Sequence, residues 1–226
     1  MSAKPAKRSI ILASRSPRRI ALLRDAGIAF TAIPPKYDEP DMSRWQLSPV
    51  AFAESVSHYK ARSLADEHPE SLILGADTVV ALAGKLFGKP VDVEDARRIL
   101  VALTGTTHEV ITGITLYEPA TGRRRITHET TRVTMRAMSA SQLEEYLDSG
   151  EWQGKAGAYG IQDSGDAFVE RTEGSFSNVV GLPMELVMEV LAEFGVTDPT
   201  GVPPAAGPGP GRGFRSAQWP GGPRPD

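Results

Sequence analysis

The chain has 226 residues, including 22 glycines and 18 prolines, and a formal net charge of −3. Its last 28 residues hold eight of the prolines and seven of the glycines, and carry +2, so the preceding 198 residues carry −5. That charge argues against a general nucleic-acid or anionic-membrane binder, and the absence of cysteine excludes disulfides, thiolate metal sites and cysteine nucleophiles. The negative net charge is compatible with a small polyanionic substrate that a few basic side chains hold.

Composition divides the chain into three parts. Residues 1–8 and the Pro/Gly-rich residues 198–226 are predicted to be disordered, because the tail cannot bury enough apolar surface to fold. Residues 9–197 are ordinary in composition and long enough for a single domain with a lobe. The apolar run near the start spans only Ile10 to Ala13, too short for a signal peptide or membrane span, so we expect a cytoplasmic protein.

The first predicted unit is a strand, a loop and a helix. Residues 9–13 are apolar and β-branched at their start, which predicts a short buried strand. Ser16 as N-cap, Pro17 at the first helical position and Gly27 as C-cap predict the helix after it. Residues 28–33 predict a second strand, which two prolines end. Such a unit is typical of the start of an α/β domain.

The middle of the chain continues this alternation. Helical periodicity over 50–66 precedes 71–82, the strongest strand signal in the sequence, which residues 75–78 (GADT) are expected to interrupt. A turn at 88–90 and a helix over 95–103 follow.

The next segments favour antiparallel pairing. Residues 108–117 and 124–136 are rich in Thr, Val and Ile with Gly122 between them, which predicts a hairpin. Such a hairpin makes the expected sheet mixed and excludes a purely parallel one.

The remaining elements are predicted from caps and periodicity. Ser141 and Glu144 predict a capping box for a short helix. A glycine-rich polar segment over 154–165, a strand over 166–170 and an amphipathic helix over 183–194 complete the chain before the tail.

Residues 14–19 (SRSPRR) are a candidate anion site. A helix N-terminus offers free N–H groups and the positive end of the dipole, and arginine suits bidentate phosphate contacts. The same residues also fit a capped surface helix with solvated arginines, so both interpretations stay open.

Asp77 is an acidic residue inside a strongly apolar strand. Aspartate is rarely buried without a task or a partner, so near a phosphate site Asp77 could hold Mg²⁺ or act as general base towards water. It could instead cap a bulge or pair with a neighbouring lysine.

Other polar residues are weaker candidates when taken singly. Lys60 and Lys89 could be cations for a polyphosphate, and Glu39 a second metal carboxylate, although each could equally be solvated. Small residues in 155–162 permit close approach to a ligand, and Gln162 offers a donor and an acceptor for a base edge; a flexible loop is the alternative. P-loop, GxGxxG, HExxH and GxSxG patterns are absent.

As a set, these segments resemble the Maf family of nucleoside triphosphate pyrophosphatases. The matching stretches occur in order between about residues 9 and 195 and are LASRSPRR (12–19), YDE (37–39), Lys60, LGADTVV (74–80), GKP (88–90), LTGTTHEVITG (103–113), KAGAYGIQ (155–162) and NVVGLP (178–183).

The resemblance implies hydrolysis between the α- and β-phosphates of a nucleotide, with Asp77 as the proton acceptor and a divalent cation, Mg²⁺ or Mn²⁺, as cofactor. It implies a metal site with Glu39 beside Asp77. The substrate-binding residues it implies are Ser14, Arg18, Arg19, Lys60, Thr78, Lys89 and Gln162. The implied fold is α/β, an elongated mixed β-sheet with flanking helices of the Maf/ITPase-like kind. A homodimer with no nucleic-acid or membrane partner is expected.

Three positions resemble those of the dTTP/UTP pyrophosphatase subgroup, namely Arg18, Thr78 and Gln162. We therefore expect hydrolysis of dTTP and UTP, and of modified pyrimidine nucleotides, to the monophosphate and pyrophosphate. A 7-methyl-GTP or modified-purine pyrophosphatase, and a nucleotide-binding regulator of cell division with little turnover, are the alternatives. Gly75, Gly157 and Gly160 lie in the segments that are expected to approach the nucleotide.

Overall fold

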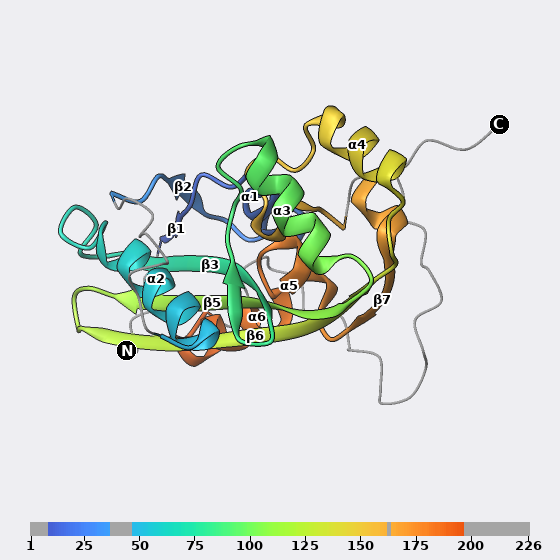
Figure 1. The fold of residues 1–226 in the computed structure, drawn as a ribbon. Coiled ribbons are helices and arrows are strands. Elements are labelled where there is room, and N and C mark those ends of the chain that lie inside the picture. The colour runs from blue at the N-terminus through green and yellow to red at the C-terminus, as the bar shows by residue number, and fades with distance from the viewer. Residues whose placement is uncertain (1–8, 37–46, 162–163, 197–226) are drawn as a thin grey trace, which may run out of the picture.

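A mixed β-sheet forms the centre of the computed structural model, which describes residues 9–36, 47–161 and 164–196. Within these ranges seven strands pair in the order β2-β1-β3-β5-β6-β7, with β4 beside β3 (Figure 1). The strands are β1 (Ile10–Ala13), β2 (Thr31–Ile33), β3 (Leu72–Leu82), β4 (Lys85–Phe87), β5 (Thr107–Glu118), β6 (Arg123–Met135) and β7 (Val169–Glu173).

Helices flank the sheet, as expected for an α/β domain. They are α1 (Pro17–Asp25), α2 (Pro49–Arg62), α3 (Val93–Leu103), α4 (Ala140–Ser149), α5 (Phe176–Val180) and α6 (Met184–Glu193), with 3₁₀ turns at η2 (Ala156–Ala158) and η3 (Ser164–Phe168). No helix in the described residues combines the length and apolar composition that crossing a membrane requires.

The sheet is mixed for the expected reason. β1 pairs in parallel with β2 and β3, whereas β3, β5, β6 and β7 pair antiparallel in succession. The predicted hairpin is confirmed as β5 and β6, and Gly122 lies in its turn with φ 71°.

The interruption predicted within residues 75–78 is wrong, because β3 pairs with β5 without a break from Ile73 to Ala81. The break lies on the opposite edge of β3. There β1 pairs with β3 only as far as Gly75 and β4 pairs with it only from Val80 onward, so residues 76–79 have no strand partner on that edge among the described residues. Asp77 therefore lies where the sheet is split.

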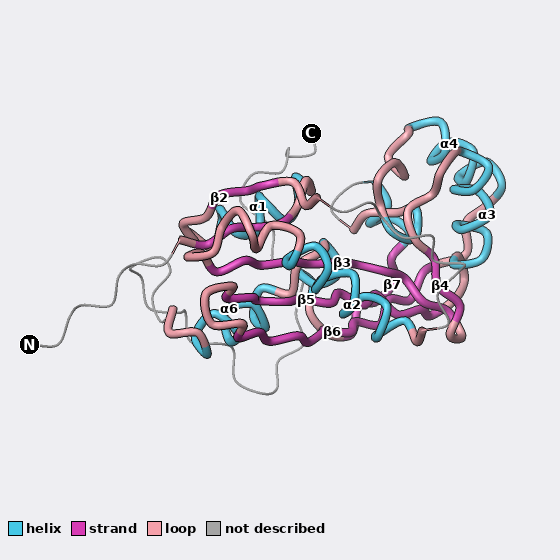
Figure 2. The backbone as a smooth tube through the Cα atoms, turned by 90° about the vertical axis from the view of Figure 1, so that its left-hand side faces the viewer, coloured by secondary structure: helices cyan, strands magenta, loops and turns pink. Residues whose placement is uncertain are grey.

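Two cores lie on the face of the sheet that is remote from α2. One packs α1 and α6 on the first half of β3 and includes Leu23, Leu74 and Val187. The other lies beneath α3 and α4 at the opposite end and includes Val80 and Leu100. Figure 2 shows α3 and α4 gathered at one end of the elongated sheet and α1 and β2 at the other.

Several local predictions need correction. The capping box of α4 is formed by Ser139 and Gln142, because Ser141 already lies inside the first turn. α1 is capped by Ala26, and Gly27 follows it with φ 70°. The last strand begins at Val169, since the residues before it form η3.

Other boundaries shift by a few residues. β2 is confined to Thr31–Ile33, α2 ends at Arg62, and α3 begins at Val93 because Asp92 is its N-cap. The short elements β4 and α5 had no predicted counterpart.

Candidate active site

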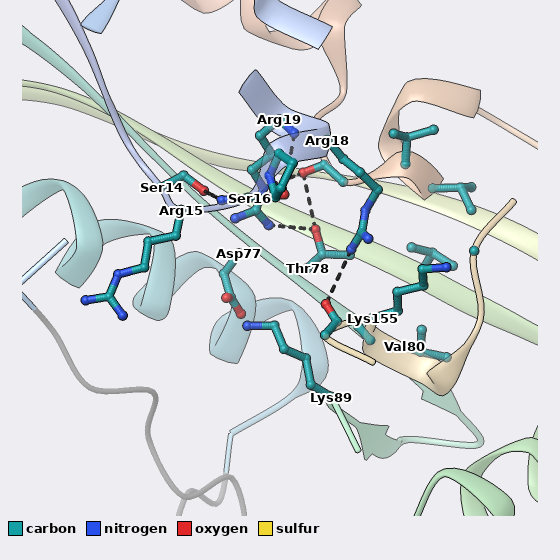
Figure 3. Close-up of a pocket in the computed structure, with 18 of the residues that line it drawn as sticks. Ser14, Arg15, Ser16, Arg18, Arg19, Asp77, Thr78, Val80, Lys89 and Lys155 are labelled. Carbon is teal, nitrogen blue, oxygen red and sulfur yellow. Dashed lines mark hydrogen bonds between the residues drawn. The ribbon is translucent and has the colours of Figure 1, made fainter. Parts of the chain in front are cut away.

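A cavity of about 770 Å³ opens at the split edge of β3. Its walls come from the loop between β1 and α1, the middle of β3, the turn after β4, residues 153–161 and the end of α5 (Figure 3). Segments that are far apart in sequence thus converge on one concave surface.

The structure brings the described candidate residues together in this cavity. Its lining includes all seven of them, namely Ser14, Arg18, Arg19, Lys60, Asp77, Thr78 and Lys89. Glu39 and Gln162 lie outside the described residues, as do the predicted disordered segments.

The lining is strongly cationic. Among its described residues Asp77 is the single acidic side chain, against seven basic ones: Arg15, Arg18, Arg19, Lys36, Lys60, Lys89 and Lys155. The whole chain carries −3, so this concentration of positive charge is local. A concave site of this sign attracts a polyanion.

Asp77 and Lys60 form an ion pair at the floor of the cavity. Lys60 Nζ donates to Asp77 Oδ1 at 2.6 Å, and the side chains are only 7% and 13% exposed. The interpretation that Asp77 pairs with a lysine is therefore confirmed, and Asp77 also lines the cavity. Figure 3 shows Lys89 pointing toward Asp77 from the opposite wall.

Lys60 reaches Asp77 because α2 lies unusually close to the sheet. A Cβ at Gly75 would be 2.2 Å from the Ser57 carbonyl oxygen, and one at Gly113 would be 2.4 Å from the Ala53 carbonyl oxygen. A hydrogen bond of 2.8 Å between the hydroxyls of Ser57 and Thr115 joins the two layers. Gly75 itself is absent from the cavity lining and makes room for the backbone of α2, whereas Asp77 and Thr78 of the same segment line the cavity.

Arg19 is buried and fastened to three protein acceptors. Its Nε donates to the Gly181 carbonyl at 2.8 Å, Nη1 to the Ala76 carbonyl at 2.9 Å and Nη2 to Thr78 Oγ1 at 3.0 Å. The Ala76 carbonyl lies on the edge of β3 that lacks a strand partner, so Arg19 supplies a donor there. The rigid fork of a guanidinium suits three acceptors that converge from different directions.

Thr78 belongs to the same network. Its hydroxyl lies 2.8 Å from that of Thr112, which donates in turn to the Asn178 carbonyl at 3.3 Å. The Asn178 amide donates to the Val110 carbonyl at 2.9 Å. Thr78 thus links β3 to β5 and α5 in addition to lining the cavity.

The serines of the first loop cap α1. Ser16 Oγ accepts from the Arg19 N–H at 3.4 Å, as its predicted N-cap role requires, and Ser14 Oγ accepts from the Ser16 N–H at 3.1 Å. These two backbone donors are therefore used inside the loop. Arg18 extends from the helix across the cavity, where Nη2 donates to the Gly154 carbonyl at 3.4 Å.

Lys155 is one of the lining residues, with Arg15 and Lys36, that were not among the site residues expected from the sequence. It is 8% exposed and lines the cavity on the wall opposite α1. A lysine followed directly by small residues, in a segment suited to close approach, was the available signal.

We predict that Arg19→Lys destabilises the protein by about 2–4 kcal/mol, because an ammonium cannot reach three acceptors and leaves buried carbonyls without a donor. Urea unfolding measures the free-energy change. Arg24→Lys, which substitutes a basic residue in the last turn of α1, is the control and should change the stability by less than about 0.5 kcal/mol. An Arg19→Lys protein as stable as this control would contradict the stabilising role of the three Arg19 hydrogen bonds.

The fold and the site define a mixed α/β protein with a cationic cavity built around a lysine-paired aspartate. The Maf-like protein family model matches residues 9–194, and the chain belongs to this family.

Relatives resemble the chain over most of its length. It is 43% identical over 187 residues to a dTTP/UTP pyrophosphatase from Moorella thermoacetica, which covers 83% of this chain and 95% of the relative. A dTTP/UTP pyrophosphatase from Ruminiclostridium cellulolyticum is 42% identical over 184 residues, 81% and 95% of the two chains. Among solved structures, a HAM1 protein from Coxiella burnetii aligns over 82% of this chain and 99% of its own, with 18% identity and a TM-score of 0.43.

Proposed function

We propose that this protein is a hydrolase that cleaves dTTP and UTP between the α- and β-phosphates, giving the nucleoside monophosphate and pyrophosphate. The observation that carries the proposal is the Asp77–Lys60 pair facing a cavity in which every other charged side chain among the described lining residues is basic. The names of relatives that are about 40% identical over more than 80% of the chain support the substrate assignment.

Asp77 is the proposed general base. A water oxygen forms a bond to phosphorus, the bridging P–O bond breaks, pyrophosphate departs with that electron pair, and the water proton passes to the Asp77 carboxylate. Lys60 holds the carboxylate at 2.6 Å and so fixes its direction. Lys89, Lys155 and Arg18 line the same cavity, where fixed positive charge stabilises the charge that develops on the phosphates.

A divalent cation fits the described donors, and we include Mg²⁺ or Mn²⁺ in the proposal. The described residues contain no group of three or more acidic or histidine side chains for an all-protein metal site. Mg²⁺ commonly takes one or two carboxylates and completes its shell with phosphates and water, so Asp77 would serve, with Glu39 as the second candidate. When bound, the cation neutralises phosphate charge as a Lewis acid.

The remaining expectations stay predictions from the sequence. These are the homodimer, the cytoplasmic location, the lack of nucleic-acid and membrane partners, and the activity on modified pyrimidine nucleotides.

A substrate panel tests the proposed function. Purified protein is assayed for pyrophosphate and monophosphate release from dTTP, UTP, CTP, 5-methyl-UTP and 7-methyl-GTP, with Mg²⁺ and with Mn²⁺. We expect the highest kcat/KM for dTTP and UTP, and identically purified Asp77→Asn protein controls for contaminants. Preference for 7-methyl-GTP would replace the substrate assignment. Tight nucleotide binding without release of pyrophosphate would instead favour the alternative of a nucleotide-binding regulator of cell division with little turnover.

A further inference from the structure

A buried hydrogen-bonded pair lies behind one wall of the cavity. His108 Nε2 and Tyr159 Oη are 2.7 Å apart, and the two rings meet edge to face with centroids 5.5 Å apart. His108 comes from β5 and is 1% exposed, whereas Tyr159 is 6% exposed and lines the cavity. Burial lowers the pKa of His108 to about 4 and raises the pKa of the Tyr159 hydroxyl. Both side chains are therefore neutral near pH 7.

The backbone just before Tyr159 is strained. Gly157 and Ala158 adopt successive left-handed conformations, with φ values of 74° and 63°. For alanine this conformation costs about 1–2 kcal/mol, and such strain persists only where the surroundings hold it. The Tyr159 side chain, anchored in the α3–α4 core, is the nearest fixed point on the C-terminal side of this turn.

The strained turn is connected to two lysines of the cavity. Lys155 begins it, and the Lys155 carbonyl accepts from the Ala158 N–H at 3.1 Å. The Gly157 N–H donates to the Gly88 carbonyl at 3.0 Å, directly before Lys89 in the chain. One turn therefore bridges both lysines, and the residue that ends it is Tyr159.

We propose that the His108–Tyr159 hydrogen bond has a positioning role: it holds Lys89 and Lys155 where their side chains meet the phosphates of the bound nucleotide. Neither His108 nor Tyr159 touches the reacting atoms in this scheme. The kinetic consequence rests on the proposed function, whereas the consequence for binding a bare polyphosphate does not.

Three substitutions isolate the hydrogen bond. Tyr159→Phe removes the hydroxyl and keeps the ring, His108→Leu removes its partner, and His108→Gln keeps a polar atom close to the place of Nε2. We expect the first two to lower kcat for dTTP and UTP about tenfold and to raise KM only several-fold, because misplaced cations act mainly on the charge that develops in the transition state. His108→Gln should recover most of the loss. Tyr117→Phe, which alters a tyrosine of β5 outside the cavity lining, is the matched control and should leave kcat unchanged.

A binding experiment separates this inference from the proposed function. Calorimetry with inorganic pyrophosphate as the probe is applied to wild type, Tyr159→Phe, Lys155→Met, Lys89→Met and the two double variants. If Tyr159 acts through the lysines, Tyr159→Phe weakens binding several-fold, and adding it to either lysine variant has a smaller effect than in wild type. Additive effects, an unchanged Kd in Tyr159→Phe, or wild type that binds no pyrophosphate would each overturn the proposal. If the protein binds pyrophosphate and the variants show the expected non-additive effects, but the protein hydrolyses no nucleotide, only the proposed function would be overturned.

Discussion

Asp77→Asn is expected to lower kcat for dTTP and UTP by about 10²–10⁴-fold, the usual loss when a general base is removed. The amide keeps the size of the carboxylate, and its oxygen still accepts from Lys60, but it cannot take a proton from water. The measurement is steady-state release of pyrophosphate at saturating substrate, so that a change in KM does not hide the change in kcat.

The control for this substitution is Asp66→Asn, which alters an exposed carboxylate paired with Arg62 on the surface. It should leave kcat unchanged. Urea unfolding of the Asp77→Asn protein shows whether lost activity follows from lost structure. A folded Asp77→Asn enzyme that retains more than a tenth of wild-type kcat would remove Asp77 from the role of base.

Gly75→Ala is expected to destabilise the protein by about 3 kcal/mol or more and to abolish most of its activity. The new Cβ would lie 2.2 Å from the Ser57 carbonyl oxygen and 2.8 Å from the Ala61 backbone nitrogen, so the backbone of α2 itself must move. Lys60 lies on that helix, and its displacement would loosen the pair with Asp77. Urea unfolding and kcat for dTTP are the two measurements.

Gly122→Ala is the matched control, because it makes the same chemical change in the β5–β6 turn. A Cβ there meets nothing within 4 Å, and the cost comes only from φ 71°, which predicts a loss of about 1–2 kcal/mol with unchanged kcat. Equal destabilisation by the two substitutions would contradict the close approach of α2 to the sheet.

Much of the fold could be predicted from the sequence because its signals are local. Ser16 and Pro17 start α1 as predicted, and the Thr- and Val-rich segments on either side of Gly122 pair as a hairpin. Such signals need only neighbouring residues. The capping box failed because Ser139 and Ser141 are both followed three residues later by a Gln or Glu, and only the path of the chain selects the first.

The break in the sheet could not be predicted in the same way. The segment GADT suggested an interruption within β3, whereas β3 is continuous and its neighbours β1 and β4 leave the gap. The sequence of a strand does not indicate where the adjacent strands end. For the same reason the sequence could not show that Gly75 makes room for the backbone of α2.

The sequence by itself determined the family, the mixed α/β class and the candidate residues, because ordered motifs and local periodicity are written along the chain. The tertiary structure decided how those residues act on one another. It paired Lys60 with Asp77, fastened Arg19 to acceptors 57 to 162 residues away, and placed Lys155 on the opposite wall. These contacts depend on how α1 and α2 pack against a sheet with one broken edge, and packing between distant segments leaves no local pattern in the sequence.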